Sequence, residues 1–465
     1  MSDNMTTQIP QDYVPIVYNI PTDTNTNGIF KYDLKPQFSK SIDFPKFSLG
    51  FQHYIHQSKD KMAITSEFEG KKKIYFVMNK FERYIDDYDT DIGNTSVQYF
   101  NLDLKQKPNI LSRSFYKLWE ILFMFDLINL NNEDFVSAHL AEGPGSFIQA
   151  VMFYRDLYCK KGSSKNDKYY AITLHAENMD KHIPKLEEKF INYYAKEKPV
   201  RVEIHKTYPI KQARMSKHKD NGDLTDLKTI KLFGGKFSDK KADLITADGG
   251  FDWVNENVQE QEAFKLLLGQ IIAALNIQKK GGHFVCKFYE SFANTTSKLI
   301  NLLGSFYEKI HLVKPLTSRK SSSEKYAVCI NYLDAKDNSK KIEQLEKLLE
   351  EMNRKNINLV DFFPEYHITD NYKAALITTN TKIANKQFIA INEIVDFIKK
   401  QNYRGDEYQK RRNMQIDASK YWCDTFFPDL KDFSSKKKEI EKMISDLVEK
   451  GNKEIQDLKG KLDFS

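Results

Sequence analysis

The sequence predicts an α/β protein in which helices cover both faces of a mostly parallel β-sheet. The alternation of two kinds of segment favours this fold class. From residue 134 to about residue 332, short apolar runs typical of buried strands alternate with amphipathic stretches of helical length. This alternation is the pattern that crossover connections between parallel strands produce, because each helix returns the chain to the starting edge of the sheet.

An arm and one helix precede the alternating region. Residues 1–65 are rich in Pro, Asn, Thr and aromatic residues and have no sustained period, so we expect an extended arm that packs on the rest of the protein. Residues 13–20 of this arm could form an edge strand, and residues 72–77 are a second strand candidate. Residues 111–129 carry apolar side chains at helical spacing and predict a helix.

The alternating region itself accounts for the sheet. The last two of its strands are expected to form a hairpin-like pair. We expect strands at 135–140, 169–174, 200–205, 242–247, 282–287, 311–314 and 326–332, with helices at 147–158, 183–194, 260–278 and 297–306.

Beyond residue 335 the composition becomes more charged and the pattern helical. Residues 341–355 predict an amphipathic helix, and further helical stretches lie around 393–401 and 411–427. Residues 434–462 could form a short coiled-coil-like helix interrupted at Gly451, or a solvated surface helix. We therefore divide the chain into an N-terminal arm and accessory segment, a central α/β domain and a mostly helical C-terminal extension, at 1–104, 105–335 and 336–465.

Composition excludes several classes of protein. The 465 residues are 40% hydrophobic, which is enough for a real core, and no uncharged apolar run approaches the roughly 18 residues of a membrane helix. Four scattered cysteines without CxxC spacing suggest neither a disulfide framework nor a metal site. We therefore expect an intracellular, cytoplasmic protein without a metal. The net charge of +7 permits an anionic partner such as RNA without requiring one.

Charged residues stand where an open α/β sheet binds its ligands, beyond the carboxyl ends of the strands. The turn at 141–147 follows the first strand, and its glycines let the backbone approach a ligand. Asp248 ends the fourth strand, Lys287 ends the fifth, and Glu324 opens the last. Since Lys117 lies in the helix before the first strand, two lysines and two carboxylates could converge on one crevice.

These residues, in this order and with their flanking segments, resemble the FtsJ-like 2′-O-ribose methyltransferases, which use S-adenosylmethionine and a Lys-Asp-Lys-Glu tetrad. The resemblance covers roughly residues 105–332 and implies a Rossmann-like class I methyltransferase sheet. Four segments are similar to the Adrift-type cap methyltransferase branch, which has relatives in large DNA viruses. They are HLAEGPGSF at 139–147, DNGDLTD at 220–226, LITADGGFDW at 244–253 and KPLTSRKSSSEKYAVC at 314–329.

The resemblance also implies a role for each member of the tetrad. Lys287 would be the base for the ribose hydroxyl, and Asp248 would orient it. Lys117 would hold the ribose oxygens, and Glu324 would position Lys117 or Lys287. Because crowding by Lys117 and partial desolvation both disfavour a second positive charge, we expect the pKa of Lys287 to be lowered.

For S-adenosylmethionine, the resemblance places the methionine end at the turn after the first strand. Its residues there are Glu142, Gly143, Pro144, Gly145, Ser146 and Phe147. Glu142 replaces a residue that is small in bacterial relatives, and it could take over an acidic role toward the ammonium group. Glu177 is a candidate ribose ligand and Asp223 a candidate partner of the adenine amino group, whereas Asp226 could be a helix N-terminal charge.

For RNA, basic and aromatic residues flank the expected crevice. Arg113, Arg319 and Lys320 could contact phosphates, and Trp253 could stack on a base or belong to the core. No cap-binding pocket can be identified, so an expectation of cap specificity rests on the resemblance.

The implied function is methyl transfer from S-adenosylmethionine to a ribose 2′-hydroxyl of RNA, at cap-proximal nucleotides of mRNA. The implied partners are capped mRNA and other capping enzymes, with no membrane. A viral member of the branch would act in the host cytoplasm or the virion. Two alternatives stay open: methylation of another RNA such as rRNA, and a non-catalytic RNA-binding or scaffold subunit of a capping complex. A nicotinamide-dependent oxidoreductase is disfavoured, because no GxGxxG follows the first strand.

Overall fold

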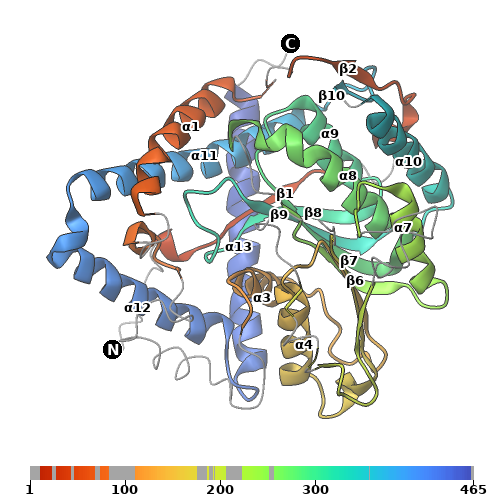
Figure 1. Ribbon diagram of the computed structural model, residues 1–465, viewed down its shortest axis with the longest axis horizontal. Helices are drawn as coiled ribbons and strands as arrows, with labels where there is room; N and C mark the ends of the chain where they lie inside the picture. The colour runs from red at the N-terminus through yellow and green to blue at the C-terminus, as the bar shows by residue number, and fades with distance from the viewer. Residues whose placement is uncertain are drawn as a thin grey trace.

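An eight-stranded mixed sheet forms the centre of the molecule (Figure 1). The computed structural model describes residues 11–22, 28–42, 45, 47–68, 74–82, 110–174, 186–187, 192, 194–205, 222–250, 256–355 and 357–461. The strands are β1 (Ile16–Ile20), β3 (Val136–Leu140), β4 (Lys168–Ile172), β5 (Val202–Ile204), β6 (Ala242–Ala247), β7 (Gln278–Phe288), β8 (Tyr307–Lys314) and β9 (Lys325–Tyr332). Their spatial order is β1-β8-β9-β7-β6-β3-β4-β5.

Five neighbouring strands of this sheet, from β5 to β7, are parallel. The remaining three pair antiparallel, so that β9 joins β7, β8 joins β9, and β1 forms the edge. The predicted parallel core and its closing hairpin-like pair are thus confirmed. The strand order reverses between β3 and β6, which is the position where open α/β sheets bind ligands.

Helices cover both faces of the sheet. The helices are α1 (Leu49–Lys61), α3 (Ser114–Met124), α4 (Ser146–Tyr158), α7 (Leu227–Gly234), α8 (Gln259–Ile277), α9 (Asn294–Leu303), α10 (Asn338–Lys355), α11 (Asp370–Lys399), α12 (Asp406–Phe426) and α13 (Phe433–Lys461). Successive strand residues alternate between two cores. Ile245 and Phe284 pack with α7, α8 and α9, whereas Leu244 and Val285 pack with α3 and α4.

Short elements complete the described part of the chain. β2 (Gln37–Ser39) and β10 (Asn358–Asp361) form a separate antiparallel pair. The 3-10 helices are η1 (Gln11–Tyr13), η2 (Gly28–Lys31), η3 (Met62–Phe68), η4 (Ile74–Met78), η5 (Ser163–Asn166), η6 (Gly235–Phe237), η7 (Glu256–Val258) and η8 (Asn402–Arg404). The strand predicted at 72–77 is therefore wrong over its described residues, which form η4. Most of the helix predicted at 183–194 lies outside the described residues.

The N-terminal arm and the C-terminal helices pack directly on the central sheet. The predicted edge strand is confirmed as β1, and α13 runs past it as one long helix (Figure 1). The predicted interruption at Gly451 is absent. A Cβ on Gly451 would lie 3.0 Å from the Tyr18 ring, so the glycine allows α13 to approach β1 closely. Because Ile440, Ile444 and Ile455 are buried, α13 is a packed helix rather than a solvated one.

Candidate active site

Asp248 and Lys287 meet because they end neighbouring parallel strands. Ala247 of β6 is paired with Cys286 of β7, so the next residue of each strand emerges at the same edge. Lys287 Nζ lies 3.1 Å from Asp248 Oδ1 and also donates a hydrogen bond of 2.8 Å to the Asp248 carbonyl oxygen. Across the antiparallel ladder, Lys287 is opposite Tyr326, whose hydroxyl donates to Asp248 Oδ1 at 3.1 Å.

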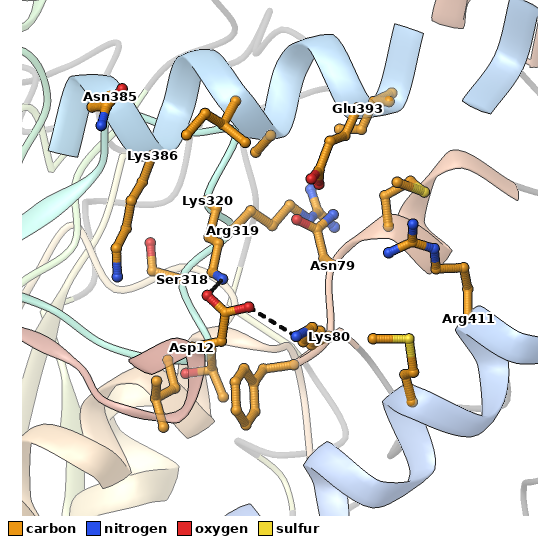
Figure 2. A pocket seen from close by; sticks show the side chains of 18 of the residues that line it. Asp12, Asn79, Lys80, Ser318, Arg319, Lys320, Asn385, Lys386, Glu393 and Arg411 are labelled. Atoms are coloured by element: carbon orange, nitrogen blue, oxygen red, sulfur yellow. Dashed lines mark hydrogen bonds and ion pairs between the residues drawn. The ribbon is translucent and has the colours of Figure 1, made fainter. Parts of the chain in front are cut away.

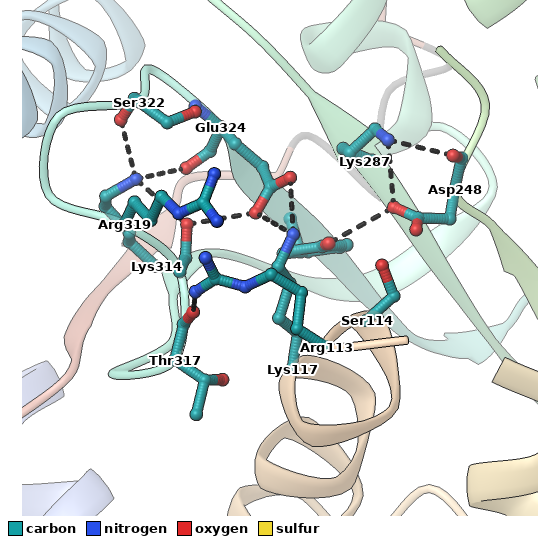
Figure 3. A network of polar contacts seen from close by, with 12 residues as sticks. Arg113, Ser114, Lys117, Asp248, Lys287, Lys314, Thr317, Arg319, Ser322 and Glu324 are labelled. Carbon is teal, nitrogen blue, oxygen red and sulfur yellow. Dashed lines mark hydrogen bonds and ion pairs between the residues drawn. The ribbon is translucent and has the colours of Figure 1, made fainter. Parts of the chain in front are cut away.

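A second buried ion pair lies beside the first (Figure 3). Lys117 in the first turn of α3 places its Nζ 2.8 Å from the carboxylate of Glu324, which directly precedes β9. The four residues predicted to converge are therefore brought together, in the pairing Lys117–Glu324 and Lys287–Asp248. All four side chains are largely buried, which strengthens the interaction between the charges.

The charge state of Lys287 differs from the one expected from its sequence context. Burial is the largest single influence and disfavours the charged ammonium, but Asp248, Tyr289 and Glu324 together outweigh it and raise the pKa of Lys287 above its ordinary value. The predicted lowering is wrong for a simple geometric reason. The nearest charge to Lys287 is a carboxylate at 3.1 Å, and Lys117 is neutralised by its own partner.

Burial prevails at Lys117, whereas neighbouring charges prevail at Glu324. Burial lowers the pKa of Lys117, although Glu324 opposes that shift. For Glu324, burial favours the protonated form, but Lys117, Lys287 and Lys314 together hold its pKa well below the usual range. Glu324 is therefore ionised at neutral pH, and it fixes the position of the Lys117 ammonium.

The loop that carries Glu324 is held by two buried residues that sequence reasoning missed. Lys314, at the end of β8, donates to the carbonyl oxygens of Ser322 and Glu324 at 2.7 and 2.8 Å. Glu120 on α3 accepts from the backbone N–H groups of Leu316 and Thr317 at 2.7 and 2.8 Å. The sequence did carry a signal for Lys314, because a strand with an apolar last segment ends in a lysine there, much as Lys287 lies next to the end of β7.

A cavity of about 450 Å³ opens at the strand ends beside the Lys287–Asp248 pair. Ala141, Gly143 and Pro144 line it after β3, Thr173 and Leu174 line it after β4, and Gly222 to Thr225 form another wall. Asp248, Gly250, Lys287 and Tyr289 complete the wall nearest the ion pair, and Ser112, Ser114 and Leu266 also contribute.

Two glycines allow close packing in the wall of this cavity. Gly222 has a φ of +76°, and a Cβ there would lie 2.0 Å from the Thr173 carbonyl oxygen. A Cβ on Gly250 would lie 2.4 Å from the Tyr289 hydroxyl and 3.4 Å from Lys287 Nζ. A cavity of this size, with apolar walls and a few polar groups, fits a nucleoside-containing ligand such as S-adenosylmethionine.

The turn after β3 lines the cavity with Gly143 and Pro144. Gly145 caps α4 with a φ of 114°, and Ser146 and Phe147 begin that helix. Glu142 Oε1 accepts from the N–H groups of Phe147 and Ile148 at 2.8 and 3.0 Å. Burial raises the pKa of Glu142 well above its usual range. Glu142 Oε1 therefore caps α4, and the contact of Glu142 with the ammonium group stays a prediction.

Of the candidate nucleoside ligands, Asp223 is the one that the structure describes. It lines the cavity, and its Oδ1 accepts from the backbone N–H and the hydroxyl of Thr225, both at 2.8 Å. Asp226 caps α7 by accepting from the Lys228 N–H, which matches the alternative considered for it. Glu177 and Trp253 lie outside the described residues.

The candidate RNA contacts are held by internal ion pairs rather than extended into solvent. Arg113 and Arg319 both bind the buried Glu82, at 2.7 and 2.8 Å. Lys320 binds Asp12 at 2.8 Å. Glu82 and Asp12 thus fix the positions of these three side chains, and their contact with RNA phosphates stays a prediction.

Known proteins resemble this chain over the same segment. Residues 110–332 match the family model for FtsJ-like methyltransferase. "Cap-specific mRNA (nucleoside-2′-O-)-methyltransferase 2" of Drosophila melanogaster is 28% identical over 54% of this chain and 33% of its own length. "Cap-specific mRNA (nucleoside-2′-O-)-methyltransferase 1" of Homo sapiens is 40% identical over 23% of this chain and 14% of its own.

A third relative bears on activity. "Inactive cap-specific mRNA (nucleoside-2′-O-)-methyltransferase 1B" of Caenorhabditis briggsae is 28% identical over 44% of this chain and 25% of its own length. The matched segments thus span a third or less of each of these three relatives. Residues 110–332, which carry the sheet and the paired lysines and carboxylates described above, are thus similar to the FtsJ-like methyltransferase family.

Proposed function

We propose that this protein transfers a methyl group from S-adenosylmethionine to a ribose 2′-hydroxyl of RNA, at cap-proximal nucleotides of mRNA. One observation carries the proposal. Four charged residues from four separate segments form two buried ion pairs, and one pair lines the cavity at the point where the strand order reverses. The cap-proximal target is supported by the names of the fly and human relatives.

The proposed chemistry needs alignment and the removal of one proton. S-adenosylmethionine, when bound, supplies a methyl group that is already activated by a positively charged sulfur. A ribose hydroxyl is a poor nucleophile near neutral pH, so the protein must hold its oxygen in line and accept its proton. We assign the proton to Lys287 Nζ, with Asp248 holding the resulting ammonium in place.

This assignment has a consequence for pH dependence. Because Asp248 raises the pKa of Lys287, only a small fraction of Lys287 is neutral at pH 7 in the free protein. The rate should therefore increase as more of the neutral base forms. Lys117, fixed by Glu324, would hold the ribose oxygens from the side of α3.

The non-catalytic alternative has a concrete precedent, because one relative is named inactive. Sequence similarity alone thus does not establish turnover. The two intact ion pairs favour an active enzyme, since a scaffold subunit has no need of a buried Lys287–Asp248 pair at the wall of a ligand cavity. Methylation of rRNA would use the same site, and only the RNA substrate distinguishes it.

The partner proteins, the source and the cellular location of this protein are proposed from the sequence alone. Association with other capping enzymes, a viral source and action in the cytoplasm or virion remain predictions. Within the described residues, none of the helices combines the length and the apolar character that crossing a membrane requires.

The test measures transfer of labelled methyl from S-adenosylmethionine to three short RNAs: a capped RNA, the same RNA with its first nucleotides already 2′-O-methylated, and an uncapped rRNA fragment. We expect incorporation into the first alone. Lys287→Ala should abolish transfer while cofactor binding persists. Lys279→Ala is the matched control, because Lys279 lies at the opposite end of the same strand in an exposed ion pair with Asp243.

Each other outcome has a distinct meaning. Transfer to the rRNA fragment would replace the cap-proximal target, and equal transfer to the blocked RNA would exclude the 2′-hydroxyl of those nucleotides. Cofactor binding without transfer to any RNA would favour the scaffold. Retention of most activity in Lys287→Ala would remove Lys287 from the proton-accepting role.

A further inference from the structure

A second cavity, of about 480 Å³, lies between the N-terminal arm, the C-terminal helices and the loop after β8 (Figure 2). Seven of its lining side chains are cationic and two are acidic. The cations come from segments that are far apart in the sequence, including Lys80 of the arm, Arg319 of the loop, Lys386 of α11 and Arg411 of α12. A concave surface with this charge balance attracts anions.

Most of these cations are already ordered by a carboxylate, but Lys386 is not. Asp12 accepts from both Lys80 and Lys320 at 2.8 Å. Within the described residues, Lys386 Nζ makes no hydrogen bond or ion pair, and Figure 2 shows it directed from α11 into the cavity. Burial and the nearby Lys320 lower the pKa of Lys386, so its positive charge is incompletely balanced.

Two buried donors in the cavity wall also lack an acceptor within the described structure. They are Nδ2 of Asn79, whose side chain belongs to a residue only 9% exposed, and Nε of Arg113. Buried N–H groups are normally hydrogen-bonded, and an unmatched one indicates a missing partner. The Lys386 ammonium in a cavity with this excess of cations is suited to a ligand with anionic oxygens such as phosphate, and the unmatched N–H groups lie in residues of the same wall.

The cavity adjoins the tetrad through α3 and the loop after β8. Arg113 lines this cavity, whereas its neighbours Ser112 and Ser114 line the cavity beside Lys287. Ser318, another lining residue, donates to Glu324 at 3.0 Å. A polymer with a ribose at Lys287 and phosphates on either side could therefore continue into the second cavity.

We propose that this cavity binds phosphate groups of the RNA substrate next to the ribose that is methylated, with Lys386 as a direct contact. The inference rests on the proposed function and adds the arm and the C-terminal helices to the RNA site. The phosphates are either those of the RNA strand or the triphosphate bridge of a cap, which share the same chemistry.

The experiment measures binding of two fluorescent RNAs of identical sequence, one capped and one with a 5′-hydroxyl, at several salt concentrations. Lys386→Ala should weaken binding about fivefold near 0.1 M salt and reduce the slope of log K against log salt by about 0.7, the value of one single-strand phosphate contact. Lys399→Ala is the matched control, since Lys399 is exposed on the same helix and lies outside the cavity.

Weaker binding of both RNAs assigns the cavity to strand phosphates, and weaker binding of the capped RNA alone assigns it to the triphosphate bridge. Unchanged affinity and salt slope for both RNAs would overturn the proposal, even if the wild type methylates RNA. If the wild type binds RNA without methylating it, the proposed function fails while the same comparison still tests the cavity. Absence of RNA binding by the wild type would overturn both.

Asn79→Ala, tested alongside, should weaken binding of the same RNA whose binding Lys386→Ala weakens.

Discussion

Replacing the buried Lys314 by methionine should change how the stability of the protein depends on pH. Lys314 is 4% exposed, and its ammonium is surrounded by the oxygens of Ser318, Ser322 and Glu324. Burial lowers its pKa from 10.5 to about 7. Methionine has a similar length and no charge, so Lys314→Met removes this titration while largely preserving the packing volume.

The sign follows from proton binding in the two states. Between pH 7 and 10.5 the unfolded chain keeps the Lys314 proton and the folded protein releases it, so stability increases with pH. The buried Lys314 ammonium destabilises the folded protein fully below pH 7, and this destabilisation is absent above pH 10.5. With these two pKa values, the free energy of unfolding gains about 3 kcal/mol from this group between pH 7 and 9.5.

The assay is urea denaturation of the wild type and Lys314→Met at pH 7 and 9.5. The difference in free energy of unfolding between them should shift by about 3 kcal/mol toward the wild type at the higher pH. Lys309→Met, an exposed position on the same strand, should show no such shift. A difference that stays constant within about 1 kcal/mol would refute the reasoning, because it would mean that Lys314 titrates alike in both states.

Three further outcomes are expected. The value of kcat/KM should rise about tenfold per pH unit between pH 7 and 9, because Lys287 must lose its proton; a flat profile would contradict its role as base. Tyr326→Phe removes one hydrogen bond to the catalytic carboxylate, so kcat should fall roughly fivefold at unchanged cofactor affinity, and an unchanged kcat would make that bond dispensable. Gly451→Ala should lower the melting temperature because its Cβ meets the buried Tyr18 ring, whereas Gly460→Ala, with open space around it, should stabilise α13 by about 1 kcal/mol. Equal stabilisation by both substitutions would show that the Tyr18 ring moves aside without any loss of stability.

Local patterns were sufficient to predict the sheet and two members of the site. Asp248 and Lys287 could be assigned because each directly ends an apolar run, and strand ends meet at one edge of a parallel sheet. The capping role of Glu142 also had a local signal, since a carboxylate just before a helix favours its N-terminus. That signal was outweighed by an expectation carried over from the family resemblance.

Contacts between distant segments could not be predicted in the same way. Glu82 binds Arg113 and Arg319, yet nothing in the sequence around Glu82 indicates a partner more than two hundred residues away. The same limit affects the pKa of Lys287, which depends on which charge is nearest in space. The continuity of α13 through Gly451 likewise depends on Tyr18, which lies at the other end of the chain.

The place of β1 in the sheet has a consequence for how the protein can be made. Ile16 of β1 pairs with Lys314 of β8. During synthesis, β1 therefore has no partner strand until nearly three hundred more residues have been added. A polypeptide cut to residues 110–332 would lack both β1 and α13. The backbone groups of β8 would then be exposed along one edge, as a template for pairing with a second molecule. The segment that matches the family model is thus expected to aggregate when produced by itself, because β1 of the arm covers the edge of β8 in the full-length protein.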